Sequence, residues 1–205
     1  MSIRQYIVSQ FRQPRGSVGR LAGYIMDRRP SNRQRNSWTV DLLDMQPESN
    51  VLEIGCGPGL ALDACLEQVR HGTVVCLDHS ELMVHQALVR LRDAVEDGRC
   101  SVRLGDVSVL EESEEQYDRI FSVNVVQFFS DLEDTFRILF SRLKPGGMVA
   151  TTYMPRMKNA TAEDAVRKAT EVQRVMESAG YTEITAHNLP IEPVPATCVT
   201  GLRPK

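Results

Sequence analysis

The chain has 205 residues, the length of one ordinary domain, and can bury a hydrophobic core without disulfides or metals. With 42% hydrophobic and 25% charged residues, its composition excludes the disordered, collagen-like and membrane-spanning classes. No apolar stretch approaches the roughly 18 residues that a membrane helix needs. Since the N-terminus lacks the apolar run of a secretory signal, we expect a cytoplasmic protein.

The cysteines are odd in number and lack the C-x-x-C spacing of a metal or redox motif. They are Cys56, Cys65, Cys76, Cys100 and Cys198. This pattern argues against both a disulfide framework and a zinc site, so we expect reduced thiols and no bound metal.

Charge is distributed unevenly, although the net charge is only −3. Residues 1–37 contain eight arginines and a single acidic residue, Asp27. The field of this basic arm would attract an anionic substrate, RNA or an acidic membrane surface, but a solvated helix face is an equally good interpretation.

After the arm, short apolar runs alternate with helical patterns, which is typical of an α/β fold. Strands are predicted over 51–54, 73–77, 101–104, 117–125, 148–153, 182–188 and 196–202. Helices are predicted over 60–69, 80–98, 130–143 and 161–180. The last two strands have no helix between them and should pair in antiparallel fashion.

This order predicts a doubly wound, Rossmann-like, mostly parallel seven-stranded sheet with helices on both faces and a C-terminal antiparallel strand pair. Residues 47–205 would form the core, and residues 1–46 a helical arm or lid over the active site. We expect Ser80 to cap the second helix, Ser130 and Glu133 to form a capping box for the third, and a turn at 144–147 to end it.

Three glycines alternate directly after the first strand, in an E-x-G-x-G-x-G pattern that begins at Glu53. Gly55, Gly57 and Gly59 lack the Cβ atoms that would keep a ligand away from the backbone. The helix that begins near Leu60 directs unpaired N–H groups toward the same space. The sequence therefore predicts a small-molecule site at this turn.

Polar residues follow the other strands at the same edge of the predicted sheet, where open α/β sheets bind ligands. Asp78 closes the second strand, at the position that holds ribose hydroxyls in doubly wound folds. Asp106 follows the third strand, and Asn124 lies near the end of the fourth. Because Leu60 stands where G-x-G-x-x-G would have its last glycine, a hydride-transfer enzyme is not favoured.

With these motifs in register, the sequence resembles the class I S-adenosylmethionine-dependent methyltransferases from about residue 51 to 202. The resemblance is carried by the glycine turn, the acid in LDHSELM, the pair Gly105-Asp106, the strand YDRIFSVNVVQF and the turn LKPGG. It implies S-adenosyl-L-methionine as methyl donor and S-adenosyl-L-homocysteine as product.

The resemblance also implies which residues bind the donor. They are Glu53, Gly55, Cys56, Gly57, Gly59, Asp78, His79, Met83, Asp106, Val107, Asn124 and Val125. Asp78 would bind both ribose hydroxyls, Asp106 the adenine amino group, and Asn124 would lie beside the methyl-bearing sulfur. For Met83 a plain core position, and for His79 an exposed loop position, stay open as alternatives.

Methyl transfer from a sulfonium depends mainly on proximity and orientation, so a general base is optional. The candidate bases are Tyr153, His79 and Tyr24, and no spacing selects one of them. The candidate substrate-binding residues combine aromatic, cationic and amide groups. They are Tyr24, Arg28, Arg33, Trp38, Gln127 and Tyr153.

Missing motifs narrow the acceptor. Residues 124–127 read N-V-V-Q in place of the D/N-P-P-Y/F tetrad of adenine and cytosine amino-methyltransferases. The chain has no cysteine between Cys100 and Cys198, where a cytosine C5 enzyme would need its nucleophile. We therefore expect O-, N- or C-methylation of a small, anionic or aromatic, molecule.

The basic arm leaves other functions open. Ile3, Ile7 and Phe11 recur among arginines as in a short interfacial helix, which would suit a peripheral-membrane lipid methyltransferase. An RNA-modifying enzyme or a non-catalytic binder would use the same arginines on phosphates. Neither nucleic acid nor a membrane is the favoured partner, and the sequence does not indicate an oligomeric state.

Overall fold

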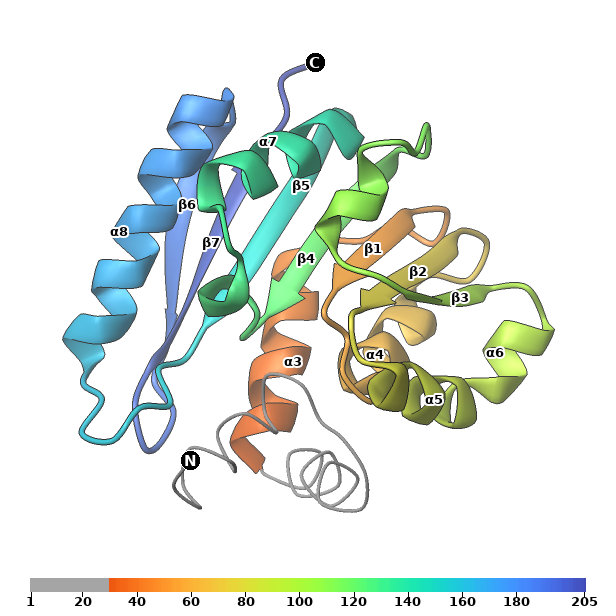
Figure 1. Ribbon diagram of the computed structural model, residues 1–205, viewed down its shortest axis with the longest axis horizontal. Coiled ribbons are helices and arrows are strands. Elements are labelled where there is room, and N and C mark those ends of the chain that lie inside the picture. The colour runs from red at the N-terminus through yellow and green to blue at the C-terminus, as the bar shows by residue number, and fades with distance from the viewer. Residues whose placement is uncertain (1–29) are drawn as a thin grey trace.

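A seven-stranded sheet runs through residues 30–205, which are the residues that the computed structural model describes (Figure 1). The strands are β1 Asn50–Ile54, β2 Thr73–Asp78, β3 Cys100–Leu104, β4 Tyr117–Val123, β5 Leu143–Tyr153, β6 Thr182–Leu189 and β7 Ala196–Leu202. Their order is β3-β2-β1-β4-β5-β7-β6. Strands β1 to β5 are parallel, whereas β7 is antiparallel to both β5 and β6. The predicted fold class is confirmed.

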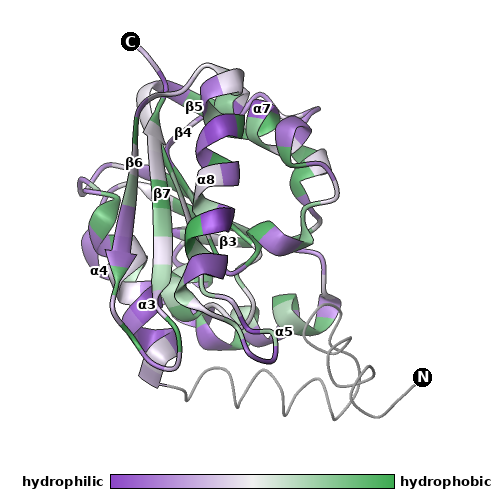
Figure 2. Ribbon diagram, turned by 90° about the vertical axis from the view of Figure 1, so that its left-hand side faces the viewer, coloured by the Kyte–Doolittle hydropathy of each residue, from purple (hydrophilic) through white to green (hydrophobic). Residues whose placement is uncertain are grey.

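Helices cover both faces of the sheet. They are α3 Pro30–Leu42, α4 Leu60–Gln68, α5 Glu81–Arg90, α6 Arg92–Glu96, α7 Leu132–Arg142 and α8 Ala162–Ala179, with short 3-10 turns η1 Val107–Leu110 and η2 Val126–Phe128. Residues of α3 to α6 share one apolar cluster, and residues of α7, α8 and the 3-10 turns share the other. Figure 2 shows β6 and β7 between α3 and α4 on one side and α8 on the other.

Alternate residues of the central strand point into the two clusters, as the pleat of a strand requires. Leu52 and Ile54 of β1 pack in the cluster with Phe136 of α7, whereas Val51 packs with Leu62 of α4. Burial on both faces explains why the central strands read as continuous apolar runs.

Helix α3 is held across the sheet by polar contacts as well as by packing. The hydroxyls of Thr39 and Thr152 of β5 share a buried hydrogen bond of 2.7 Å. Just beyond the C-terminal end of the helix, the Arg119 guanidinium donates to the carbonyl oxygens of Leu43 and, at 2.9 Å, of Asp44. These contacts fix the C-terminal half of α3 against β4 and β5. The rest of the predicted arm, residues 1–29, lies outside the described residues, so the proposed division at residue 46 stays a prediction.

Helix α7 ends directly before the predicted turn at 144–147, but the predicted start of the next strand at Met148 is wrong, because β5 begins at Leu143 and continues through residues 144–147. The segment bulges out of the ladder, since Tyr117 pairs with Leu143 but Arg119 already pairs with Met148. Gly147 permits the bulge, because a Cβ there would lie 2.9 Å from the Lys144 carbonyl oxygen.

Two helix boundaries also differ from prediction. The side chain of Asp131, and not Ser130, caps α7 by accepting from the N–H of Asp134 at 2.9 Å. The predicted helix over 80–98 is interrupted at Leu91, which leaves the helical region and is buried. Ser80 caps α5 as predicted. No helix in the described residues is long and apolar enough to cross a membrane.

The packing of α7 gives a stability prediction. Phe136 is fully buried and meets the ring of Tyr181 edge to face, so Phe136→Ala should lower the free energy of unfolding by about 3–5 kcal/mol in chemical denaturation. Val166→Ala, on the exposed side of α8, is the control and should stay within about 0.5 kcal/mol of the unmodified protein. Equal losses in the two variants would contradict this core assignment.

Candidate functional site

The turn between β1 and α4 is built from glycines in the left-handed region, with φ of +71° at Gly55, +55° at Gly57 and +84° at Gly59. A Cβ on Gly55 would lie 2.6 Å from Cγ2 of Val125, whereas a Cβ on Gly57 would meet nothing within 4 Å. Gly55 therefore allows the turn to pack against the segment after β4. Gly57 faces open space, where a ligand could approach the backbone.

Asp78 holds the other side of this turn. One of its carboxylate oxygens accepts from the N–H of Gly57 at 2.8 Å, and the other accepts from the N–H of Ser80 at 2.9 Å. Burial raises the pKa of Asp78, while the two backbone hydrogen bonds oppose that rise. The carboxylate thus links the ends of β1 and β2.

Helix α4 begins at the same turn without help from a side chain. Gly59 is its N-cap, and no side-chain hydrogen bond caps the helix there. The first N–H groups of α4 are consequently oriented toward the space in front of Gly57, as a polar or anionic ligand group would require.

Glu53 lies beneath the turn as a second, more deeply buried acid. It is 2% exposed, and its Oε2 atom has no hydrogen-bond partner. Burial, and then the nearby Asp78 carboxylate, raise the pKa of Glu53 to about 8. Glu53 therefore carries a proton at neutral pH.

Cys56, within the turn, is buried against Cys76 of β2, with the two sulfur atoms 2.7 Å apart. The hydrogen bond to Cys76, together with burial, raises the pKa of the Cys56 thiol. All of the cysteines are buried and free, as the sequence predicts.

The predicted adenine-side residues follow β2 and β3. The side chain of His79 is 41% exposed, and its Nδ1 lies 3.9 Å from Asp78. Met83 and Val107 are buried. Asp106 caps η1 by accepting from the N–H and hydroxyl of Ser108 at 3.0 and 2.6 Å, and these bonds lower its pKa. Asp106 is exposed at this edge and ionised at neutral pH.

Asn124 terminates β4 with a φ of +58° and joins it to the end of β5. Its Oδ1 accepts from the N–H of Met154 at 2.7 Å, and its Nδ2 donates to the Met154 carbonyl at 3.1 Å. The exposed Gln127 donates from Nε2 to the Asn124 carbonyl at 2.7 Å. Asn124 thereby fixes the ends of β4 and β5 beside the glycine turn.

Comparison with known proteins identifies the family. A family model for a methyltransferase domain matches residues 52–149. The chain is a class I S-adenosylmethionine-dependent methyltransferase. Over 186 residues the methyltransferase is 28% identical to the uncharacterized methyltransferase YdaC of Bacillus subtilis, which covers 90% of this chain and 98% of that protein.

Other relatives are longer. Over 182 residues the methyltransferase is 25% identical to 24-methylenesterol C-methyltransferase 2 of Oryza sativa subsp. japonica, covering 80% of this chain and 50% of that protein. The structure of Haemonchus contortus phosphoethanolamine N-methyltransferase 2 with S-adenosyl-L-methionine has the same fold, with a TM-score of 0.66 and 16% identity over 84% of this chain and 53% of that chain. The methyltransferase spans about half the length of these two relatives.

The other predicted residues are placed as follows. Tyr153 ends β5 and is 9% exposed, and burial raises the pKa of its hydroxyl, which disfavours the phenolate that a base would need. Arg33 is exposed on α3, and Trp38 packs partly buried against the α4 side of the core. Tyr24 and Arg28, like the apolar stripe behind the lipid alternative, lie outside the described residues.

Sequence reasoning missed three residues at the same edge, Asn32 and Arg35 of α3 and Arg156 after β5. Asn32 Oδ1 accepts from both arginines at 2.7 Å. The helical spacing of Asn32, Arg35 and Thr39 places them on one face of α3 and could have indicated the cluster.

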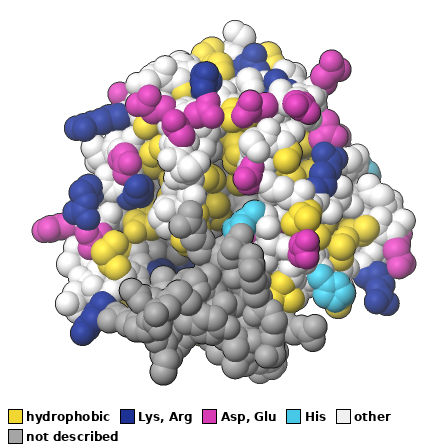
Figure 3. All heavy atoms as spheres, in the orientation of Figure 1, with side chains coloured by type: hydrophobic (Ala, Val, Ile, Leu, Met, Phe, Trp, Pro, Cys, Tyr) yellow, Lys and Arg dark blue, Asp and Glu magenta, His cyan; other side chains and the backbone are white. Residues whose placement is uncertain are grey.

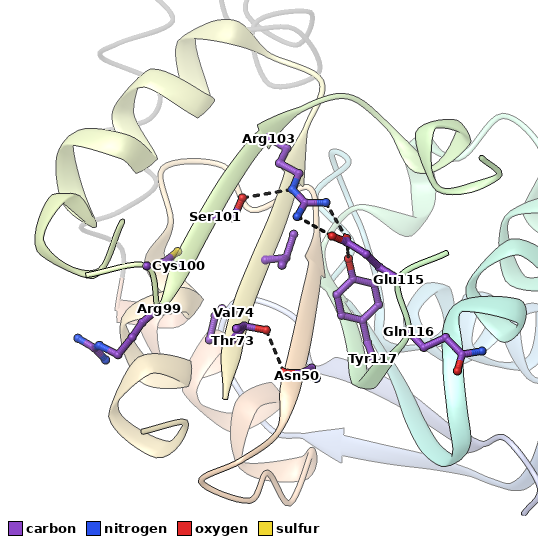
Figure 4. A pocket seen from close by; sticks show the side chains of 12 residues that line it. Asn50, Thr73, Val74, Arg99, Cys100, Ser101, Arg103, Glu115, Gln116 and Tyr117 are labelled. Atoms are coloured by element: carbon purple, nitrogen blue, oxygen red, sulfur yellow. Dashed lines mark hydrogen bonds and ion pairs between the residues drawn. The ribbon is translucent and has the colours of Figure 1, made fainter. Parts of the chain in front are cut away.

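The methyltransferase also has a cavity of about 350 Å3 away from this edge. Figure 4 shows it beside the first residues of β2, β3 and β4, with Arg103 paired to Glu115. Figure 3 shows hydrophobic side chains in a hollow at the middle of the face seen in Figure 1 and acidic ones along its upper edge. Because ligands of open α/β sheets bind at the carboxyl ends of the strands, we expect the methyl-transfer site at the opposite edge of the sheet from the 350 Å3 cavity.

The buried acid gives a pH prediction. The pKa of Glu53 is about 8 in the folded protein, whereas in the unfolded chain it takes the ordinary value of 4.5. The free energy of unfolding should therefore fall as pH rises from about 4.5 to 8. The expected loss through this group is on the order of 4 kcal/mol. Glu53→Gln, which resembles the protonated acid, should remove that loss in urea titrations at pH 5 and pH 8.5.

An exposed change on α8, Glu177→Gln, is the matched control and should keep the pH dependence of the unmodified protein. If the free energy of unfolding of Glu53→Gln falls with rising pH as steeply as that of the unmodified protein, the raised pKa of Glu53 is refuted.

Proposed function

We propose that the protein transfers the methyl group of S-adenosyl-L-methionine to an oxygen, nitrogen or carbon atom of a small molecule at the ends of β4 and β5. The observation that carries the proposal is the glycine turn, in which Gly57 opens onto free space between the beginning of α4 and the Asp78 carboxylate.

The residues at the turn fit the donor. S-adenosyl-L-methionine supplies an electrophilic methyl group on a positively charged sulfur. Asp78 would accept hydrogen bonds from the ribose hydroxyls, because each carboxylate oxygen has further accepting capacity beside its backbone bond. Glu53, buried below the turn with one oxygen that has no partner, would anchor the turn or reach the donor's amino group indirectly.

The adenine side would be formed by Asp106, the backbone of Val107, and Met83. Asp106 keeps an ionised carboxylate at the edge of the sheet, which suits an amino group of the base. Met83 and Val107 provide buried apolar surface next to it. His79 is exposed beside Asp78 and would flank the adenine.

At the methyl-transfer position the protein would act by orientation. Asn124 and Val125 are held in place by Met154 and by Gly55, respectively, so that the acceptor's nucleophilic atom can be aligned rather than activated. Proximity and orientation can supply roughly 7–11 kcal/mol of a barrier, which makes a strong base unnecessary. The raised pKa of Tyr153 agrees with a hydroxyl that donates or packs rather than one that takes a proton.

The relatives support a small-molecule acceptor. Proteins of similar sequence are named for methylating a sterol and phosphoethanolamine, which differ widely in polarity. The family resemblance therefore supports the donor site and the class of acceptor without selecting one acceptor.

Calorimetry with S-adenosyl-L-homocysteine tests the donor site. Asp78→Ala should weaken binding more than tenfold, because two hydrogen bonds to a charged group are lost. Gly57→Ala should have a similar effect, since its Cβ would occupy the open space in front of the turn.

The control is Asp118→Asn, at the amino end of β4, where the carboxylate pairs with Lys144 at 2.8 Å. It should bind S-adenosyl-L-homocysteine within twofold of the unmodified protein. No binding by the unmodified protein, or equal affinity in all variants, would refute the proposed donor site.

A further inference from the structure

The strongest unexplained feature at the carboxyl edge is a buried cation. Arg35 of α3 is only 4% exposed, yet among the described residues no carboxylate lies within ion-pair distance of its guanidinium. Its Nη2 donates to Asn32 Oδ1 at 2.7 Å, its Nη1 contacts the sulfur of Met154 at 3.1 Å, and its Nε has no partner. A neutral amide and a thioether are poor compensation for a buried charge.

A second guanidinium meets the first. Nη2 of Arg156, an exposed residue just after β5, donates to the same Oδ1 of Asn32 at 2.7 Å. Burial, and then the charge of Arg156, lower the pKa of Arg35 to about 9, so Arg35 is still charged at neutral pH. Two like charges converging on one amide oxygen repel each other, and an anion between them would relieve that repulsion.

The position of the pair separates it from the donor's own carboxylate. Met154, whose sulfur contacts Arg35, is bound through its backbone to Asn124 at the end of β4. Figure 1 shows the beginning of α3 near the ends of β4 and β5. The glycine turn and Asp78 belong to β1 and β2, on the other side of β4. The arginines therefore border the acceptor side of the site.

The geometry points to an oxyanion subsite in which Arg35 and Arg156 bind a carboxylate or phosphate group of the methyl acceptor. This inference rests on the proposed function, because it assigns a charge to the acceptor of that reaction. Guanidinium groups suit the task, since they bind carboxylates and phosphates through paired hydrogen bonds. Arg156 would meet the anion at the entrance, and Arg35 would bind it inside. The acceptor is thus a small anionic molecule, and the subsite uses arginines different from the predicted Arg28 and Arg33.

The test measures two ligands on the same protein. Inorganic phosphate and benzoate are titrated by calorimetry into protein saturated with S-adenosyl-L-homocysteine, with chloride replacing the anion to hold ionic strength constant. At least one probe should bind the unmodified protein in the millimolar range. Preference for phosphate would identify a phosphorylated acceptor, and preference for benzoate a carboxylated one.

Arg35→Met and Arg156→Met should each lower the affinity for the bound probe at least tenfold, while the affinity for S-adenosyl-L-homocysteine changes less than threefold. Arg174→Met, an exposed change on α8, is the control and should bind both ligands like the unmodified protein. Arg35→Met should also raise the melting temperature by about 2–5 °C, because it removes a buried charge without a carboxylate partner. A merely structural arginine would show the opposite shift.

Three results would overturn the inference. In the first, neither phosphate nor benzoate binds the unmodified protein. In the second, Arg35→Met and Arg156→Met both bind the probe as tightly as the unmodified protein does. In the third, Arg35→Met weakens the binding of S-adenosyl-L-homocysteine tenfold but leaves the binding of 5′-methylthioadenosine unchanged. That result would assign Arg35 to the donor's carboxylate. If the unmodified protein does not bind S-adenosyl-L-homocysteine, the proposed function is refuted instead. Failure of the anion subsite and failure of the proposed function are therefore distinguishable.

Discussion

The site depends on a turn that only glycine can make and that two neighbours hold open. Gly55 packs against Val125 with no room for a Cβ, and the N–H of Gly57 is bound by the Asp78 carboxylate. The left-handed backbone of this turn would strain any other residue type. Because these contacts join β1 to β2 and to the segment after β4, the turn fixes the relative positions of three strand ends.

Buried ionisable groups are concentrated at the same edge of the sheet. Glu53 and Asp78 lie beneath the turn, and Arg35 lies beside the end of β5. Each of these groups costs stability in the absence of a ligand, since burial disfavours its ionised form. Perturbed ionisable groups of this kind gather where a protein binds or reacts, and here they divide into an acidic donor side and a basic acceptor side.

The sequence predicted the fold because its strongest signals are local. Apolar runs, the glycine turn and Ser80 as a cap all depend on neighbouring residues, and the structure confirms them. The bulge in β5 was missed because the Lys144–Gly147 segment reads as a turn, whereas its pairing depends on β4, far away in the chain. Arg156 was missed for the same reason: its guanidinium lies 2.7 Å from Oδ1 of Asn32 only after α3 packs across β5, whereas the contact between Asn32 and Arg35 is local to α3.

The most direct test of this account is the backbone amide NMR spectrum during titration with S-adenosyl-L-homocysteine. Donor binding at the glycine turn should shift the amide resonances of Gly57 and Ser80 most strongly, because both amides donate to Asp78 and Gly57 borders the open space. If the shifts instead concentrate at Thr73 and Cys100, which line the cavity at the opposite edge, while the glycine amides stay unchanged, the donor site is elsewhere and the account is wrong.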